Sequence, residues 1–132
     1  MIVGTFGKAG QLFAAEQTVA RTAGEILAAN RVAGKAAEAL AKADLIAQGN
    51  TILGSQVAIW TSTGLRVIDH LVQTPASQII AYEVKAGNAV RNSAQIAKDA
   101  EIATKGGVLV GKNAPDFLRG VLRVIQTVEV RY

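Results

Sequence analysis

The sequence has no cysteine, two prolines and a single histidine among its 132 residues. The absence of cysteine excludes disulfides, thiolate zinc sites and a cysteine nucleophile, and it fits a protein that acts in a reducing compartment. No apolar run approaches the ~20 residues that cross a bilayer, so we expect no membrane insertion. The first residues, MIVGTFGK, lack the charged start and long apolar stretch of a signal peptide. The expectation is a soluble single domain.

Basic residues outnumber acidic ones by 14 to 10, which gives a net charge of +4. A basic balance favours polyanionic partners such as nucleic acid, through long-range attraction and counterion release. If Glu38, Asp69 and Glu83 share one metal site, removing these three of the ten acids leaves 14 basic against 7 acidic residues elsewhere. Charge alone still fits many basic domains that bind no nucleic acid.

The hydrophobic period predicts an α/β domain with a mixed central sheet, in which a three-strand meander is flanked by helices. In chain order, the expected elements are helices over 9–30 and 32–48, strands over 51–61, 65–73 and 79–85, a helix from 92 or 93 to 104, a strand over 108–110, a helical turn after 115 and a strand over 124–132. Gly49 and Asn50 are expected to end the second helix. The 108–110 strand follows a helical crossover, so it is expected to pair parallel to a neighbour.

Charged residues interrupt the apolar pattern of the meander. Glu83 and Lys85 are two apart in IIAYEVKAG and therefore share one face of their strand. Asp69 shares a face of the preceding strand with apolar residues. Such placement is costly unless the site is open and functional. A hairpin through the Pro75 loop would bring Asp69 close to Glu83, although the sequence leaves the register open.

Two carboxylates and a lysine suit phosphodiester hydrolysis. Carboxylate oxygens hold a hard divalent ion such as Mg²⁺ or Mn²⁺. The ion lowers the pKa of a bound water and clamps the phosphate. A nearby lysine orients that water or offsets negative charge in the transition state.

The order of these residues resembles the PD-(D/E)xK nuclease superfamily, which includes restriction enzymes, Holliday-junction resolvases and toxin nucleases. Asp69 is followed by 13 residues and then by Glu83-Val84-Lys85. On the preceding helix, Gly34 and Glu38 match a glycine and a glutamate of resolvase-like members. The family's proline is absent, since Ile68 precedes Asp69, and this makes the match less specific.

The resemblance covers about residues 31–110, with 1–30 as an N-terminal helical extension and 111–132 as a C-terminal strand region. It implies a restriction-endonuclease-like fold and a metal-dependent endonuclease. Glu38, Asp69 and Glu83 would be the ligands of Mg²⁺ or Mn²⁺. Lys85 would orient the nucleophile, and Gln95, on the next helix, would assist. The implied substrate is DNA or structured RNA such as tRNA.

The stretch 64–115 also resembles the C-terminal toxin domains of contact-dependent growth inhibition and related polymorphic toxin systems. This second resemblance implies delivery as part of a larger secreted protein and action in the cytoplasm of a target bacterial cell. It also implies an acidic cognate immunity protein as partner.

Simpler interpretations stand beside these. Glu38 could pair with Lys42 at helical i, i+4 spacing. Arg91, Lys98 and Lys105, at spacings of seven, form either a stripe that contacts phosphates or an ordinary solvated face.

The remaining candidates are assigned to structure. His70 alternates away from Asp69 and is expected to have a structural or surface role rather than a catalytic one. Trp60 and Tyr82 are expected in the core rather than as base-stacking platforms. The alternative functions are a non-catalytic nucleic-acid-binding or scaffold module and a housekeeping resolvase-like nuclease.

Overall fold

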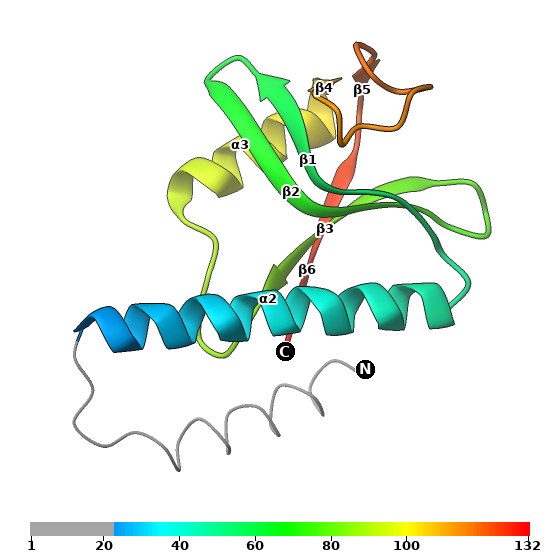
Figure 1. Ribbon diagram of the computed structural model, residues 1–132. Helices are drawn as coiled ribbons and strands as arrows, with labels where there is room; N and C mark the ends of the chain where they lie inside the picture. Colours follow the sequence, from blue (N-terminus) through cyan, green and yellow to red (C-terminus); the bar gives the residue numbers. More distant parts are fainter. Residues whose placement is uncertain (1–22) are drawn as a thin grey trace.

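The computed structural model describes residues 23–132. Its elements are α2 (Ala23–Ala47), β1 (Thr51–Thr61), β2 (Gly64–Gln73), β3 (Ile79–Lys85), α3 (Ser93–Thr104), β4 (Gly107–Val110), β5 (Leu122–Arg123) and β6 (Gln126–Arg131). The strands form one mixed sheet in the order β5-β4-β1-β2-β3-β6 (Figure 1). The expected α/β class, with a mixed sheet and helices, is confirmed.

The first three strands form the expected antiparallel meander. β1 pairs with β2 from Thr51↔Gln73 to Thr61↔Gly64, and β2 pairs with β3 from Gln73↔Ile79 to His70↔Tyr82. Gly64 has φ 127°, which favours glycine at the turn between β1 and β2. Alternating and β-branched residues bounded by turn residues therefore located these strands correctly.

The parallel partner of β3 is β6, and the expectation that the 108–110 strand would be parallel is wrong. β4 pairs antiparallel with β1, through Ala58↔Val110 and Trp60↔Val108, and antiparallel with β5. After α3 the chain first returns along β1. A Cβ on Gly107 would lie 2.4 Å from Ile59 Cγ2, so this close approach requires glycine. Only after β5 does the chain run beside β3, from Ile80↔Gln126 to Lys85↔Arg131.

Helix α2 continues without a break through Asn30, where two helices were expected to meet. The junction has neither proline nor glycine, and asparagine alone does not end a helix, because propagation adds a hydrogen bond with each residue. The part of the first expected helix before residue 23 lies outside the described residues. Gly49 ends α2 as expected, with φ 90°, while Asn50 N–H donates to the Leu45 carbonyl at 3.1 Å.

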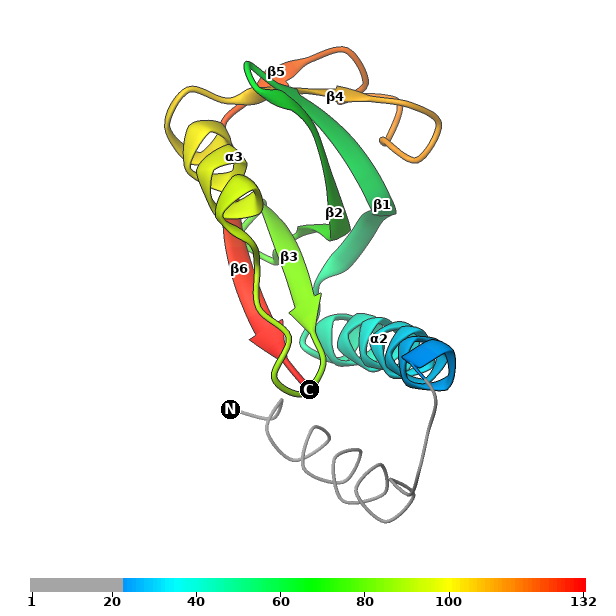
Figure 2. The same cartoon turned by 90° about the vertical axis from the view of Figure 1, so that its left-hand side faces the viewer.

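The helices cover different parts of the sheet. Ala37 and Ala41 of α2 pack with Val84 and Tyr132, so α2 crosses the sheet where β3 and β6 end (Figure 1). Figure 2 shows α3 beside the sheet and well separated from α2. Ile102 of α3 belongs to the main core, together with strand residues such as Val57, Ile59, Ile68, Leu71, Ala81 and Leu109. Within residues 23–132, no helix has both the length and the apolarity of a membrane span.

The face of β2 that packs on the core is not the face inferred from the sequence, which carries Leu65, Val67 and Asp69. Leu65 and Val67 are each 42% exposed, whereas Arg66 and Ile68 are buried. Trp60, the cross-strand partner of Leu65, is 52% exposed, so its assignment to the core is wrong. The outer surface of this hairpin is apolar, and the alternation pattern alone could not tell which side faces the core.

Candidate active site

The site lies where β2 and β3 stop pairing. Their ladder ends at His70↔Tyr82, and one step further in the same register Asp69 and Glu83 stand opposite each other. Instead of a backbone carbonyl, Asp69 Oδ2 accepts the hydrogen bond of Val84 N–H, at 2.7 Å. β2 and β3 therefore stop pairing at this point, and the Asp69 carboxylate takes the place of the missing backbone acceptor. The register that the sequence left open is the one that brings the two acids together.

Asp69 and Glu38 form a pair of carboxylates, which we call the acid pair. Gln56 Nε2 donates to Glu38 Oε1 at 2.6 Å and makes a longer contact with Asp69 Oδ1 at 3.4 Å. Burial, together with the neighbouring Glu38 carboxyl, raises the pKa of Asp69 to about 6. No ion pair within residues 23–132 compensates either acid. The acid pair accepts hydrogen bonds from the neutral Gln56 amide and, at Asp69, from Val84 N–H, but no cation among the described residues neutralises it.

Gln56 is a site residue that the sequence did not reveal. It lies opposite Asp69, between the paired positions Ser55↔His70 and Val57↔Ile68, but its φ of 54° removes it from the regular ladder. A left-handed conformation is costly for glutamine and is typical of functional positions. Here it coincides with the contact to both acids.

The surrounding loop supports this kink in β1. Asn113 Nδ2 donates to the Gln56 carbonyl at 3.1 Å. A Cβ on Gly54 would lie 2.4 Å from the Asn113 carbonyl oxygen, so the loop reaches β1 only because residue 54 is glycine. No local pattern in β1 could announce a contact with a residue 57 positions later.

His70 connects the helix and the meander beside the acid pair. Its Nε2 lies 2.8 Å from the Glu38 carbonyl oxygen, which can only accept, so Nε2 carries the proton. His70 Nδ1 is hydrogen-bonded to the Ser55 hydroxyl, also at 2.8 Å. His70 is buried and fixes the backbone of Glu38, which is the structural use expected from the sequence.

Glu83 belongs to a different electrostatic environment. Its Oε2 pairs with Arg66 at 2.9 Å and its Oε1 with Lys85 Nζ at 3.3 Å. Lys85 and Glu83 therefore share a face, as expected. Burial raises the pKa of Glu83, the Asp69 charge raises it further, and Arg66 opposes both. The two carboxylates that face each other in register are thus held by different partners.

Arg66 is the second site residue that the sequence missed. Its Nε donates to Asp99 Oδ1 at 2.8 Å, in addition to its bond with Glu83. Asp99 also pairs with Arg91 at 2.9 Å, and Arg91 pairs with Glu129 at 3.1 Å. We call these five residues the paired network. A signal was present, because an arginine in the apolar strand LRVIDHLV needs a partner if it is buried.

The remaining predicted residues are not assembled as expected. Gln95 closes a capping box: its backbone N–H donates to Asn92 Oδ1 at 2.8 Å, and its side-chain oxygen accepts from Asn92 N–H at 3.1 Å. This uses the Gln95 amide at the start of α3, and no hydrogen bond among the described residues joins it to the acids. The residue of α3 that reaches the site, through Arg66, is Asp99.

Arg91, Lys98 and Lys105 do not form a common helix face. α3 begins at Ser93, so Arg91 precedes it, and its guanidinium belongs to the paired network. Lys98 is half-buried near Gly64, whereas Lys105 is the exposed C-cap residue. The prediction of one stripe on α3 is wrong, because the regular spacing extends across the start of the helix.

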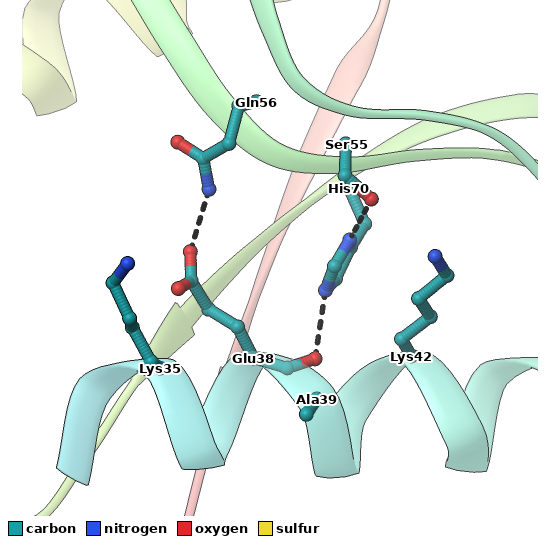
Figure 3. Close-up of a pocket in the computed structure, with 7 residues that line it drawn as sticks. All are labelled: Lys35, Glu38, Ala39, Lys42, Ser55, Gln56 and His70. Carbon is teal, nitrogen blue, oxygen red and sulfur yellow. Dashed lines mark hydrogen bonds between the residues drawn. The ribbon is translucent and has the colours of Figure 1, made fainter. Parts of the chain in front are cut away.

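A cleft of about 550 Å³ opens between α2 and β1 beside the acid pair. Its lining residues are Lys35, Glu38, Ala39, Lys42, Ser55, Gln56 and His70 (Figure 3). Figure 3 shows Lys35 and Lys42 on either side of Glu38, whose carboxylate turns to Gln56. The expected alternative, a Glu38–Lys42 ion pair, does not form. The cleft combines an acidic centre with a basic rim.

The donors fit a divalent cation in part. Within residues 23–132, no group of three or more acidic or histidine side chains is arranged to hold a metal ion. The acid pair nevertheless offers adjacent carboxylate oxygens with uncompensated charge, which is the donor chemistry of Mg²⁺ and Mn²⁺. Glu83 could join as a third ligand only by releasing Arg66 or Lys85. Glu38 and Asp69 are thus the residues that could hold such an ion, and they supply only part of a full ligand set.

Comparison with known proteins adds no relative. No protein-family model, no curated protein and no solved structure matches the chain. The function is therefore argued from the geometry of the site.

Proposed function

We propose that the protein is a metal-dependent nuclease that hydrolyses phosphodiester bonds of DNA or structured RNA. The observation that carries this proposal is the acid pair beside the Glu83–Lys85 ion pair, at the point where β2 and β3 separate. Two neighbouring carboxylates that lack a cation destabilise the folded chain at neutral pH. A bound divalent ion removes this cost, so binding a metal is the natural use of the arrangement.

Each side chain has a distinct part in this proposal. Glu38 and Asp69 hold Mg²⁺ or Mn²⁺, which when bound supplies an activated water and neutralises phosphate charge. Gln56 orients both carboxylates from one amide nitrogen. Lys85 offsets negative charge on the reacting phosphate, and Glu83, held by Arg66, positions Lys85.

The topology supports the finer fold assignment. A helix, a three-strand meander, a second helix and a strand parallel to β3 follow one another in the chain. This order agrees with the restriction-endonuclease-like fold that the Asp69 and Glu83-Val84-Lys85 spacing implies. β4 and β5 are then an inserted hairpin-like excursion between the helix and the parallel strand.

Nicking of supercoiled plasmid and cleavage of total tRNA test the proposal. Wild-type protein should cleave at least one of these with Mg²⁺ or Mn²⁺ and stop when EDTA is added. Asp69→Asn, which keeps the shape of the side chain, should be inactive and should lose Mn²⁺ binding in calorimetry. Cleavage that persists after exhaustive chelation would exclude this mechanism.

A second candidate is a non-catalytic nucleic-acid-binding module. The observation that favours it is the double ion pairing of Glu83, which leaves neither of its oxygens open. Binding of DNA or tRNA without cleavage, under any divalent metal, would select this alternative.

The proposed biological setting is that of an antibacterial toxin domain, delivered from a larger protein into the cytoplasm of a target bacterium. It is supported by the toxin-like pattern of residues 64–115 and by the net charge of +4, which suits an acidic immunity protein. Wild-type chain expressed alone should be toxic and should be tolerated with the neighbouring open reading frame of its operon. Asp69→Ala should be tolerated in both cases, and a harmless wild-type chain would end the toxin proposal.

A further inference from the structure

Basic residues lie along one side of α2, the helix that carries Glu38. Arg31, Lys35, Glu38 and Lys42 follow at spacings of four, three and four. At 3.6 residues per turn, these positions fall within roughly 60° of one another around the helix axis. Lys35, Glu38 and Lys42 indeed line the same cleft (Figure 3). The helix therefore presents one acidic centre between cationic groups.

These cations are available to a ligand. Among the described residues, Arg31, Lys35 and Lys42 form no ion pair. The arginines of the sheet side differ, because Arg66 and Arg91 are both held by acids of the paired network. All three α2 residues are exposed. A bound anion could therefore pair with these side chains without breaking an ion pair within the described residues.

Resting on the nuclease function proposed above, we propose that the phosphate backbone of the nucleic acid binds along α2. We call this surface, formed by Arg31, Lys35 and Lys42, the track. Arg31, Lys35 and Lys42 bind phosphates of one strand, and the phosphate between Lys35 and Lys42 is presented to the acid pair. With a rise of 1.5 Å per residue, the two lysines are about 10 Å apart along the axis. Along the duplex axis, one strand of B-DNA advances about 3.4 Å per phosphate, so this distance covers about three phosphates when α2 lies parallel to that axis.

The geometry of α3 makes it the natural comparison. Lys98 and Lys105 are also seven residues apart, but Lys98 is half-buried near the β1–β2 turn and Lys105 follows the last turn of α3. Neither lines the cleft beside the acid pair. The two pairs of lysines have equal spacing and equal charge, but only the α2 pair lines the cleft beside the acid pair.

Fluorescence anisotropy in EDTA tests the track, with a labelled 20-base-pair DNA duplex and with tRNA as probes. Lys35→Gln/Lys42→Gln should weaken binding of the preferred probe by about tenfold or more near 0.1 M salt. The slope of log K against log salt should fall by about 1.8, since each lost phosphate contact contributes about 0.9. Lys98→Gln/Lys105→Gln should change affinity by less than about threefold.

Charge-retaining variants exclude an indirect effect on folding. Lys35→Arg/Lys42→Arg should keep both the affinity and the salt slope of the wild type. An unchanged slope in the α2 double glutamine variant would overturn the track. So would an equal loss in the α3 control, or a wild-type chain that binds neither probe.

The outcomes separate the track from the nuclease function. Binding that depends on the α2 lysines, without metal-dependent cleavage by the wild type, leaves the track standing and ends the nuclease proposal. Metal-dependent cleavage that is unaffected by Lys35→Gln/Lys42→Gln leaves the nuclease standing and ends the track.

Discussion

The acid pair and the paired network meet where Asp69 faces Glu83, and they differ in whether their carboxylates have a cationic partner. In the paired network, Glu83 and Asp99 each have a cationic partner within 3.3 Å. In the acid pair, Glu38 and Asp69 have the Gln56 amide and no cation among the described residues. Complete pairing fixes β2, β3 and α3 relative to one another, whereas the acid pair has no compensating cation among the described residues. Two acids that face each other across the strands, Asp69 and Glu83, therefore differ in their environment, and under the proposed function only the acid pair binds a ligand.

The same substitution at two aspartates gives the sharpest contrast for stability. Asp99→Asn removes one partner of Arg66 and Arg91 in a buried setting and should destabilise the fold by about 3 kcal/mol, measured by urea unfolding. Asp116→Asn is the matched control, because Asp116 is 96% exposed in its pair with Arg119 and should change stability by less than about 0.5 kcal/mol. Equal effects at both positions would show that the paired network does not stabilise the protein.

Substitution of Lys85, which pairs with Glu83, should separate an effect on activity from an effect on stability. Lys85→Ala should lower the cleavage rate by ~10²-fold or more, the scale for losing one group that stabilises the transition state. Its melting temperature should hardly change, because Glu83 keeps its pair with Arg66. Lys112→Ala, on an exposed loop, is the control and should cleave as the wild type. A fully active Lys85→Ala variant would remove this lysine from the site.

The acid pair should give the metal-free protein an unusual dependence on pH. Because the fold raises the pKa of Asp69 to about 6 from 3.8, it favours the protonated form. The stability contribution is fully present below about pH 4 and is lost as pH rises through about 6. After allowance for partial solvent screening, we expect a loss of about 1–2 kcal/mol.

Unfolding in urea between pH 4 and pH 8, with EDTA present, measures this loss. Asp69→Asn should remove it and should be more stable than the wild type at pH 8, in contrast to Asp99→Asn. Mg²⁺ should restore the stability of the wild type at pH 8 and have no effect on Asp69→Asn. Parallel pH profiles for the two proteins would contradict an uncompensated charge on Asp69.

The smallest effect is expected at Gln56, where strain and orientation oppose each other. Gln56→Gly relieves a φ of 54°, whereas Gln56→Ala keeps the strain and loses the amide. The glycine variant should therefore be more stable than the alanine variant by about 1 kcal/mol. Both should bind Mn²⁺ more weakly than the wild type in calorimetry. Unchanged affinity in both would mean that the amide does not orient the acids.

The elements that the sequence predicted correctly are those with local causes. The strands of the meander follow from alternation and turn residues, and α3 begins at the cap formed by Asn92 and Gln95. At Asn30 the prediction was wrong, because asparagine is a weak helix former and was interpreted as the end of a helix that in fact continues. The bounds of helices and strands were thus accessible wherever neighbours in sequence decide them.

The candidate site was accessible only in part, since long-range contacts complete it. Glu38, Asp69, Glu83 and Lys85 were proposed from their spacing and from the family resemblance, and the structure places Glu38 near Asp69 and Lys85 beside Glu83. The partners of Arg66 lie 33 and 17 residues away, and no local pattern announces them. The parallel position of β6 likewise depends on β4 returning along β1 and on β5 pairing with β4.

The hydrogen bond between His70 and the Glu38 carbonyl has a consequence for the order of folding. It closes a loop of 32 residues, whereas the meander and its turns form from contacts that are closer in sequence. Loop-closure entropy delays contacts of long sequence separation, so we expect α2 to dock after the meander has formed. If the proposed function holds, a newly made or partly unfolded chain would lack Glu38 at the cleft and would be inactive. In hydrogen exchange, amide protection in α2 should accordingly appear together with metal affinity during refolding.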